Sequence, residues 1–233
     1  MADRGKKYQA AMEQLAAMPA SVDSKQALGL VKKVAHAKFD ETVGVDVTLG
    51  IDPEKSEQAV RGSVLYPHGI GKKVRVVVFA KGKYADEAAA AGADYIGVED
   101  MVEKIEGGWL DFDCAVATPD QMGVIGRLAK ILGPRGLLPN KKTGTVTFDV
   151  TAIIKDLKGG RTFFKSDRGG LVHLPLGKVS FDEQKLHDNF VAFMKALIAS
   201  RPATAKGRFV KKVIVSSTMG PGVLVELDDA FKV

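Results

Sequence analysis

The chain has 233 residues, of which 45% are apolar, so it is long enough to bury the cores of two domains. Charged residues make up 27%, and the net charge of +6 is a modest excess that is compatible with nucleic-acid binding without requiring it. The apolar runs are far shorter than the roughly 20 residues that cross a membrane, which argues against a membrane protein. The single cysteine, Cys114, lies in an apolar run and has no partner for an internal disulfide, so we expect a cytoplasmic protein.

The N-terminal part carries the pattern of a half-buried sheet. A helix is predicted over about residues 25–37. From Val43 to Leu49, apolar residues then alternate with glycine and polar residues, which predicts a strand with one face buried and the other in water. We expect Arg61–Tyr66 to be its partner strand.

Residues 70–159 follow a different pattern. Val74–Ala80 is apolar almost throughout, as in a strand that is covered on both faces. Predicted helices and strands alternate after it, at residues 85–91, 94–98, 100–105 and 112–117, with a further helix that begins after Thr118 as N-cap. This alternation predicts a small parallel, Rossmann-like α/β layer.

The C-terminal part returns to antiparallel patterns. Arg161–Lys165 and Leu171–Leu174 are predicted to form a hairpin. Ser180 and Glu183 have the spacing of a capping box at the start of an amphipathic helix, and a basic strand follows over residues 211–215.

Together these patterns predict an α/β protein with an α+β split domain, built from residues 1–69 and 160–233. A Rossmann-like parallel α/β domain, residues 70–159, is inserted into it. Glycines at the two crossings, residues 67–69 and 158–160, favour hinge motion, although they could also serve only to turn the chain.

The sequence carries no recognisable catalytic or metal site. The four histidines are scattered and lack the spacing of zinc ligands. Gly133–Gly144 is a poor phosphate-binding loop, because it lacks the Gly-Lys-Ser/Thr ending and follows a helix instead of opening one. We therefore expect no enzyme activity, no cofactor and no metal. A nucleotide-dependent enzyme that uses the inserted domain remains the alternative, since fold alone does not decide function.

Two polar tracts are better suited to RNA. Ser216–Gly222 is longer and richer in hydroxyls than a hairpin turn requires, and such groups suit phosphates and ribose, although an elaborate turn is the alternative. In the second tract, Phe39 could stack on a base while Glu41 and Thr42 bond 2′-hydroxyls. The alternatives are a core plug for Phe39 and a solvated edge residue for Glu41. If residues 42–49 and 211–216 share a sheet, the two tracts lie side by side at its edge.

At these tracts the chain resembles the bacterial L-one ribosomal proteins, which form the mobile side stalk of the large subunit. The similarity runs in order over nearly the whole chain and rests on residues 37–43, 49–53, 60–62, 65–69, 131–140 and 218–221. The resemblance implies the split two-domain fold, with the terminus-built domain as the main rRNA-binding face. It also implies contact with exit-site tRNA, repression of the protein's own operon mRNA, and a cytoplasmic protein on the large ribosomal subunit that is a monomer off the ribosome.

The resemblance also implies which residues contact RNA. The expected RNA face comprises Lys38, Phe39, Glu41, Thr42, Ser217, Thr218, Met219 and Gly220, together with Lys165, Asp167 and His173. For His173, a satisfied core or edge histidine remains an alternative. No acidic residue occurs from Gln121 to Phe148, and the cations of this tract predict a second RNA or tRNA surface: Arg127, Arg135, Lys141 and Lys142. A structural role of the Gly133–Lys142 loop and a solvated cationic face are the alternatives.

Overall fold

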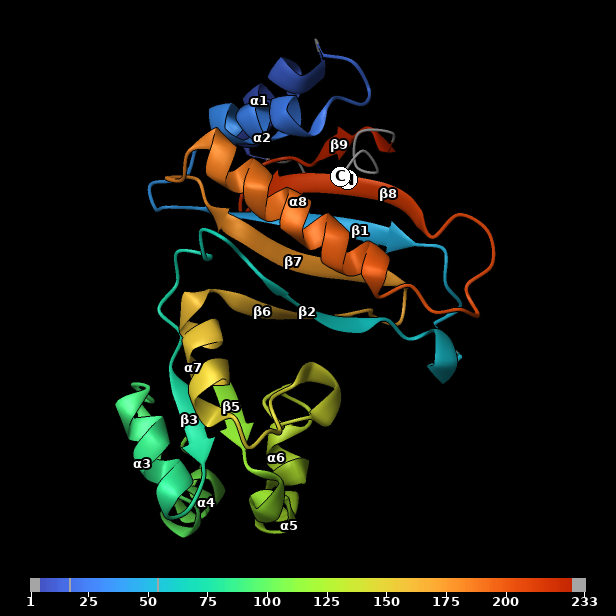
Figure 1. Cartoon of the computed structure of the whole chain (residues 1–233). Coiled ribbons are helices and arrows are strands. Elements are labelled where there is room, and N and C mark those ends of the chain that lie inside the picture. The colour runs from blue at the N-terminus through green and yellow to red at the C-terminus, as the bar shows by residue number, and fades with distance from the viewer. Residues whose placement is uncertain (1–4, 17, 54, 228–233) are drawn as a thin grey trace. The chain divides into compact units, whose positions relative to one another are not determined.

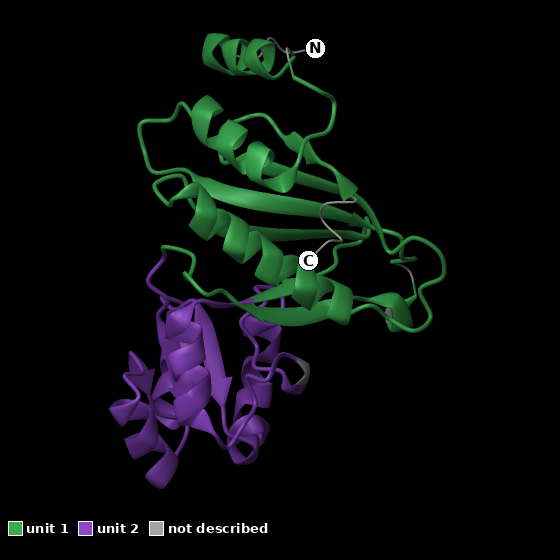
Figure 2. Cartoon of the chain, turned by 45° about the horizontal axis from the view of Figure 1, so that its top comes forward, with its two compact units in different colours: residues 1–71, 163–233 green, residues 72–162 purple. Residues whose placement is uncertain are grey.

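The structure, a computed structural model, describes residues 5–16, 18–53 and 55–227, except for the side chains of Ser56 and Lys142. The chain forms two compact units, one of residues 1–71 and 163–233 and one of residues 72–162 (Figure 2). The chain is thus of the mixed α/β class, as predicted, with an antiparallel sheet in the first unit and a parallel sheet in the second.

The first unit is built on a four-stranded antiparallel sheet of order β7-β1-β8-β9 (Figure 1). Its strands are β1 (Thr42–Leu49), β7 (Leu171–Lys178), β8 (Val210–Ser217) and β9 (Val223–Val225). Burial along β1 alternates strictly, as the sequence predicts, with Val43, Val45, Val47 and Leu49 buried. Because side chains alternate between the faces of a strand, the intervening residues lie on the opposite face of the sheet.

Two helices cover the apolar face of this sheet. They are α2 (Ser24–Val34) and α8 (Glu183–Ala199), and α8 crosses the sheet over β7 and β1 (Figure 1). Leu28 of α2 and Phe190 and Phe193 of α8 share one buried core with the inward-facing valines of β1. The helix α1 (Lys6–Ala16) precedes α2. The polar face of the sheet is left open by α2 and α8, and the candidate site lies there.

The strand pairing differs from two predictions. β2 (Arg61–Leu65) pairs with β6 (Arg161–Lys165) in a separate two-stranded sheet, whereas β1 pairs with β7 and β8. The prediction that residues 61–66 pair with the first strand was therefore wrong. The predicted hairpin was wrong as well, since β6 and β7 belong to different sheets, and among the described residues only the isolated bridge between Ser166, which follows β6, and Val172 links the two segments. Pairing follows from which neighbour lets an apolar face join the core, and sequence proximity does not decide this.

The start of α8 also differs from the prediction. Asp182 occupies the N-cap position, and its side chain makes no capping hydrogen bond. The Ser180 hydroxyl donates instead to Asp40 Oδ2 over 2.8 Å, so the predicted capping box is not formed. A serine hydroxyl goes to the better acceptor that the tertiary structure places beside it, here a carboxylate from a segment 140 residues away in the chain.

The second unit contains a three-stranded parallel sheet of order β4-β3-β5. The strands are β3 (Val76–Phe79), β4 (Tyr95–Ile96) and β5 (Cys114–Ala117), and the fully buried β3 is in the centre. The unit's longer helices are α3 (Lys83–Ala90), α4 (Glu99–Glu106) and α7 (Val150–Gly159). The helix predicted after β5 is broken into short pieces, including α5 (Met122–Ile125) and α6 (Ala129–Leu132). Thr118 does not cap it, because its hydroxyl lies 3.5 Å from the Phe79 carbonyl oxygen.

Candidate nucleic-acid interface

The two polar tracts singled out in the sequence lie side by side. β1 and β8 are antiparallel neighbours in a register that pairs Val43 with Ser217, so the start of β1 lies at the end of β8. Residues 38–42 and 217–220 therefore meet where these two inner strands end, and we call this end of the sheet the sheet edge. Both tracts belong to the first unit.

The carboxylate of Glu41 connects the two tracts. Its side chain is only 1% exposed, which rules out the solvated edge residue that the sequence left open. Glu41 Oε1 accepts from the backbone amides of His36 and Ala37 over 3.0 and 2.8 Å, and Oε2 accepts from that of Met219 over 2.9 Å. Glu41 therefore affects the surface indirectly. It holds the Met219 backbone against the segment that leads into β1.

The protonation state of Glu41 follows from the same contacts. Burial raises the pKa of this carboxyl, but the nearby Ser217 hydroxyl and the hydrogen bonds from the three backbone amides outweigh burial and leave the pKa below its ordinary value. The buried Ser217 hydroxyl contributes through its proximity, although it makes no hydrogen bond of regular geometry with a described residue. Glu41 is therefore a carboxylate at neutral pH.

Thr218 makes the second connection between the tracts. Its hydroxyl accepts from the Thr42 amide over 3.0 Å and donates to the Thr42 carbonyl oxygen over 3.3 Å, which extends the pairing of β1 and β8 by a side chain. The Thr42 hydroxyl accepts from Lys178 Nζ over 2.8 Å. A side chain at Gly220 would displace the Ser217 hydroxyl, since a Cβ atom there would lie 2.5 Å from Ser217 Oγ. The edge of the sheet is thus held in one arrangement by its own polar groups.

Two large apolar side chains are exposed at this edge. Phe39 is 56% exposed and Met219 is 53% exposed, and Lys38 beside Phe39 is also exposed. The alternative that Phe39 plugs the core is therefore wrong. An exposed aromatic ring on a fixed backbone is suited to stacking against a base or a ribose.

A chain of charged groups extends from the open face of the sheet into the turn between β6 and β7. His173 Nδ1 lies 2.6 Å from Asp46 Oδ1, and His173 Nε2 lies 3.6 Å from Asp167 Oδ2. Asp167 Oδ1 accepts from the Gly169 and Leu171 amides, so it also holds the turn. The hydrogen bond with Asp46 is the main cause that raises the pKa of His173, against the opposing effect of burial. His173 is exposed, so it is an edge histidine and not a core residue, and Lys165 is exposed at the end of β6.

A shallow groove of about 350 Å³ lies on the open face of the sheet. It is lined by Thr42, Gly44, Asp46, His173, Leu174, Pro175, Ser216, Ser217 and Thr218, and we call it the Gly44 groove. Four of the residues predicted for the RNA face line it, whereas Lys38, Phe39, Met219 and Gly220 belong to the adjacent edge and Lys165 and Asp167 to the β6 end and turn. Sequence reasoning included Ser216 in a polar tract but missed Gly44 and Asp46, although the alternation along β1 does place these two residues on the open face.

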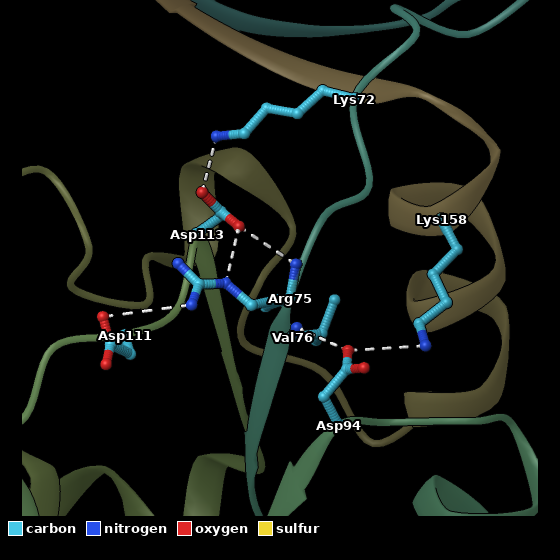
Figure 3. Close-up of polar contacts among 7 residues, drawn as sticks. All are labelled: Lys72, Arg75, Val76, Asp94, Asp111, Asp113 and Lys158. Carbon is cyan, nitrogen blue, oxygen red and sulfur yellow. Dashed lines mark hydrogen bonds and ion pairs between the residues drawn. The ribbon is translucent and has the colours of Figure 1, made fainter.

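Cations of the second unit are of two kinds. Near the parallel sheet they are paired: Lys72 Nζ lies 2.6 Å from Asp113 Oδ1, and Lys158 Nζ lies 3.4 Å from Asp94 Oδ2 (Figure 3). In the acid-free tract, four exposed cations form no ion pair with any described residue: Arg127, Lys130, Arg135 and Lys141. The predicted Lys142 side chain lies outside the described part of the structure. These cations remain available to an anionic partner.

The described residues contain no group of three or more His, Cys, Asp or Glu side chains suited to a metal ion. None of their helices combines the length and the apolar character that crossing a membrane takes.

A comparison with protein-family models supports the resemblance seen in the sequence. Residues 31–221 match the model of the ribosomal protein L1p/L10e family. The matched range includes β1, β8 and both polar tracts, and it covers more than half of the chain. The protein therefore belongs to the ribosomal protein L1p/L10e family, whose members are structural RNA-binding proteins of the large ribosomal subunit.

Proposed function

We propose that the protein binds large-subunit rRNA through the sheet edge at which residues 38–42 and 217–220 meet. The observation that supports this most directly is the buried Glu41 carboxylate, which joins both tracts and leaves Phe39 and Met219 exposed beside them. A surface that is ordered before binding also loses less entropy when RNA binds.

The chemistry of this surface suits folded RNA. Phe39 offers a stacking face and Lys38 a positive charge, and the hydroxyl-bearing residues Thr42 and Thr218 line the Gly44 groove. Double-stranded RNA presents its 2′-hydroxyls and base edges in a wide and shallow groove, which a flat sheet edge can approach. Lys165, Asp167 and His173 flank the same face in this proposal.

The test is a titration of a large-subunit stalk rRNA fragment at several salt concentrations, with an unrelated RNA of equal length as competitor. Loss of a base–aromatic stack costs about 1–3 kcal/mol, so we expect Phe39→Ala to weaken binding by roughly 5- to 150-fold. Phe148→Ala is the matched control, because Phe148 is 49% exposed but lies in the other unit. Equal affinity of both RNAs for the wild-type protein, lost as salt rises, would contradict a shaped rRNA site.

We further propose that the same edge binds a copy of the rRNA site in the protein's own operon mRNA, and so represses its translation. One surface for two RNAs predicts that they compete. The rRNA fragment should displace a labelled leader of the message, and Phe39→Ala should weaken both complexes in parallel. Simultaneous binding of both RNAs would place the mRNA elsewhere.

For the second unit we propose contact with deacylated tRNA at the exit site, through Arg127, Arg135 and Lys141. Their exposure and lack of carboxylate partners among the described residues support this. We also propose that the two crossings between the units act as a hinge during tRNA release. Gly71 and Gly160, which are near the two crossings, adopt positive φ angles of 71° and 112°, a conformation that side chains other than glycine rarely adopt.

A further inference from the structure

The Gly44 groove has a floor that the fold does not explain. Gly44 lies within β1, a central strand of the four-stranded sheet, where glycine is destabilising relative to alanine. Its φ angle is not positive, and a Cβ atom would meet only the Leu174 carbonyl oxygen at 3.7 Å, an ordinary contact. The irregular register at this point falls on β7, because Val43 pairs with Gly177 and Gly44 with Pro175. A side chain would fit at Gly44, so its absence calls for another explanation, such as the close approach of a ligand.

The groove is lined by hydrogen-bonding groups, and the charge of its lining differs from that of the basic chain as a whole. In the row next to Gly44, Asp46 lies between Ile214 and His173 on the neighbouring strands. His173 is the only lining residue that can be positively charged, although the chain as a whole is basic. A phosphate group would be repelled by the Asp46 carboxylate. The groove therefore suits the part of a nucleic acid that donates hydrogen bonds.

Asp46 is held ready to accept such a bond. Its Oδ1 atom is occupied by His173 Nδ1 at 2.6 Å, which fixes the carboxylate on the open face. No hydrogen bond from a described residue reaches its other oxygen, Oδ2, and the side chain is 39% exposed. A carboxylate only accepts hydrogen bonds, and the 2′-hydroxyl is the donor that RNA has and DNA lacks.

We propose that the Gly44 groove receives a ribose and that Asp46 accepts its 2′-hydroxyl, so that this groove makes the site selective for RNA over DNA. The inference rests on the proposed rRNA-binding function and adds the groove residues Gly44 and Asp46 to it. Gly44 lets the sugar approach the sheet, and His173 acts as a positioning residue that orients Asp46. A DNA strand in the same place leaves the carboxylate without a donor, which is costly for a charged acceptor removed from water.

Three variants of β1 test this proposal against the stalk rRNA fragment. Gly44→Ala fills the floor of the groove, and we expect it to weaken binding at least about tenfold while thermal stability stays equal or rises, because alanine suits a strand better. Thr48→Ala is the matched control, since Thr48 is also on the open face of β1 but does not line the groove. It should bind as the wild type does.

The decisive measurement combines Asp46→Ala with single 2′-deoxy substitutions scanned through the rRNA fragment. For the wild-type protein, a 2′-deoxy substitution at one or two positions of the RNA should each lower the affinity about tenfold. At those same positions, the 2′-deoxy substitution should not lower the affinity of the Asp46→Ala variant any further. The preference for the RNA fragment over DNA of the same sequence should shrink in this variant.

The outcomes separate the two proposals. If the wild type binds the rRNA fragment tightly while Gly44→Ala binds equally well, or if 2′-deoxy effects are the same in Asp46→Ala, the ribose groove is refuted and the rRNA site stands. If the wild type does not prefer the rRNA fragment over the competitor, the rRNA site itself is refuted.

Discussion

The substitution Glu41→Gln tests how the sheet edge is held together. Glutamine has the shape of glutamate but carries one acceptor and one donor group. With its oxygen in the place of Oε1, it keeps the bonds from the His36 and Ala37 amides, but its NH₂ group then faces the Met219 amide, donor against donor. If the glutamine side chain is flipped, its NH₂ group faces the His36 and Ala37 amides, so two backbone donors are opposed instead of one.

The first orientation therefore gives the smallest loss. It removes one hydrogen bond to a charged group and leaves a buried donor unsatisfied, which together destabilise the protein by about 2–4 kcal/mol. With a urea m-value of about 2 kcal/mol/M, the unfolding midpoint should fall by about 1–2 M. The Met219 backbone is released at the same time, so rRNA binding should weaken as well.

Urea unfolding followed by far-UV circular dichroism measures this change. Glu13→Gln is the control, because Glu13 is exposed on α1 of the same unit. The lowered pKa of Glu41 fixes the sign of the pH dependence: its stabilising effect is full above its ordinary value of 4.5 and is lost as pH falls through the lower folded value. The difference between the wild type and Glu41→Gln should shrink in acid. An unchanged midpoint at pH 7 would refute the role of Glu41 as the connection between the tracts.

Three further predictions concern single groups of the proposed interface. Thr218→Val removes both hydrogen bonds to the Thr42 backbone, so it should cost about 1 kcal/mol in unfolding and weaken rRNA binding in a titration; unchanged affinity would remove Thr218 from the site. Protonated His173 offsets the charge of its two carboxylate partners, and its pKa is raised above 6.5. The rRNA affinity should therefore fall as pH rises above 6.5, and His173→Gln should abolish that dependence. Lys141→Ala should lower the slope of log affinity for tRNA against log salt concentration by roughly one unit, and an unaltered slope would leave it a solvated charge.

Local sequence patterns gave the elements but not their pairing. The alternation from Val43 to Leu49 predicted which side of β1 is buried, since side-chain direction in a strand depends only on the chain itself. It could not show that β7, more than 120 residues away, lies beside β1, or that β2 pairs with β6. These choices depend on how the apolar faces of distant segments combine in one core.

For the candidate site, too, the sequence predicted one part and only the structure decided the rest. Residue types and the family resemblance pointed to Phe39, Glu41 and Thr218, and the sequence left open whether each was exposed. The structure gives Phe39 and Glu41 opposite environments although they are two residues apart. Glu41 binds the Ala37 amide next to its own tract and the Met219 amide on the other tract, while Phe39 is exposed.

By itself, then, the sequence determined the local elements, the mixed α/β class and the family. Tertiary structure alone decided which polar groups are used up in holding the protein together and which remain for a partner. The physical reason is that a hydrogen bond such as that between Thr42 and Thr218 joins residues 176 positions apart, and its formation depends on the whole sheet. The open floor at Gly44 and the free oxygen of Asp46, which no described residue approaches with a donor, became visible only once the neighbouring strands were in place.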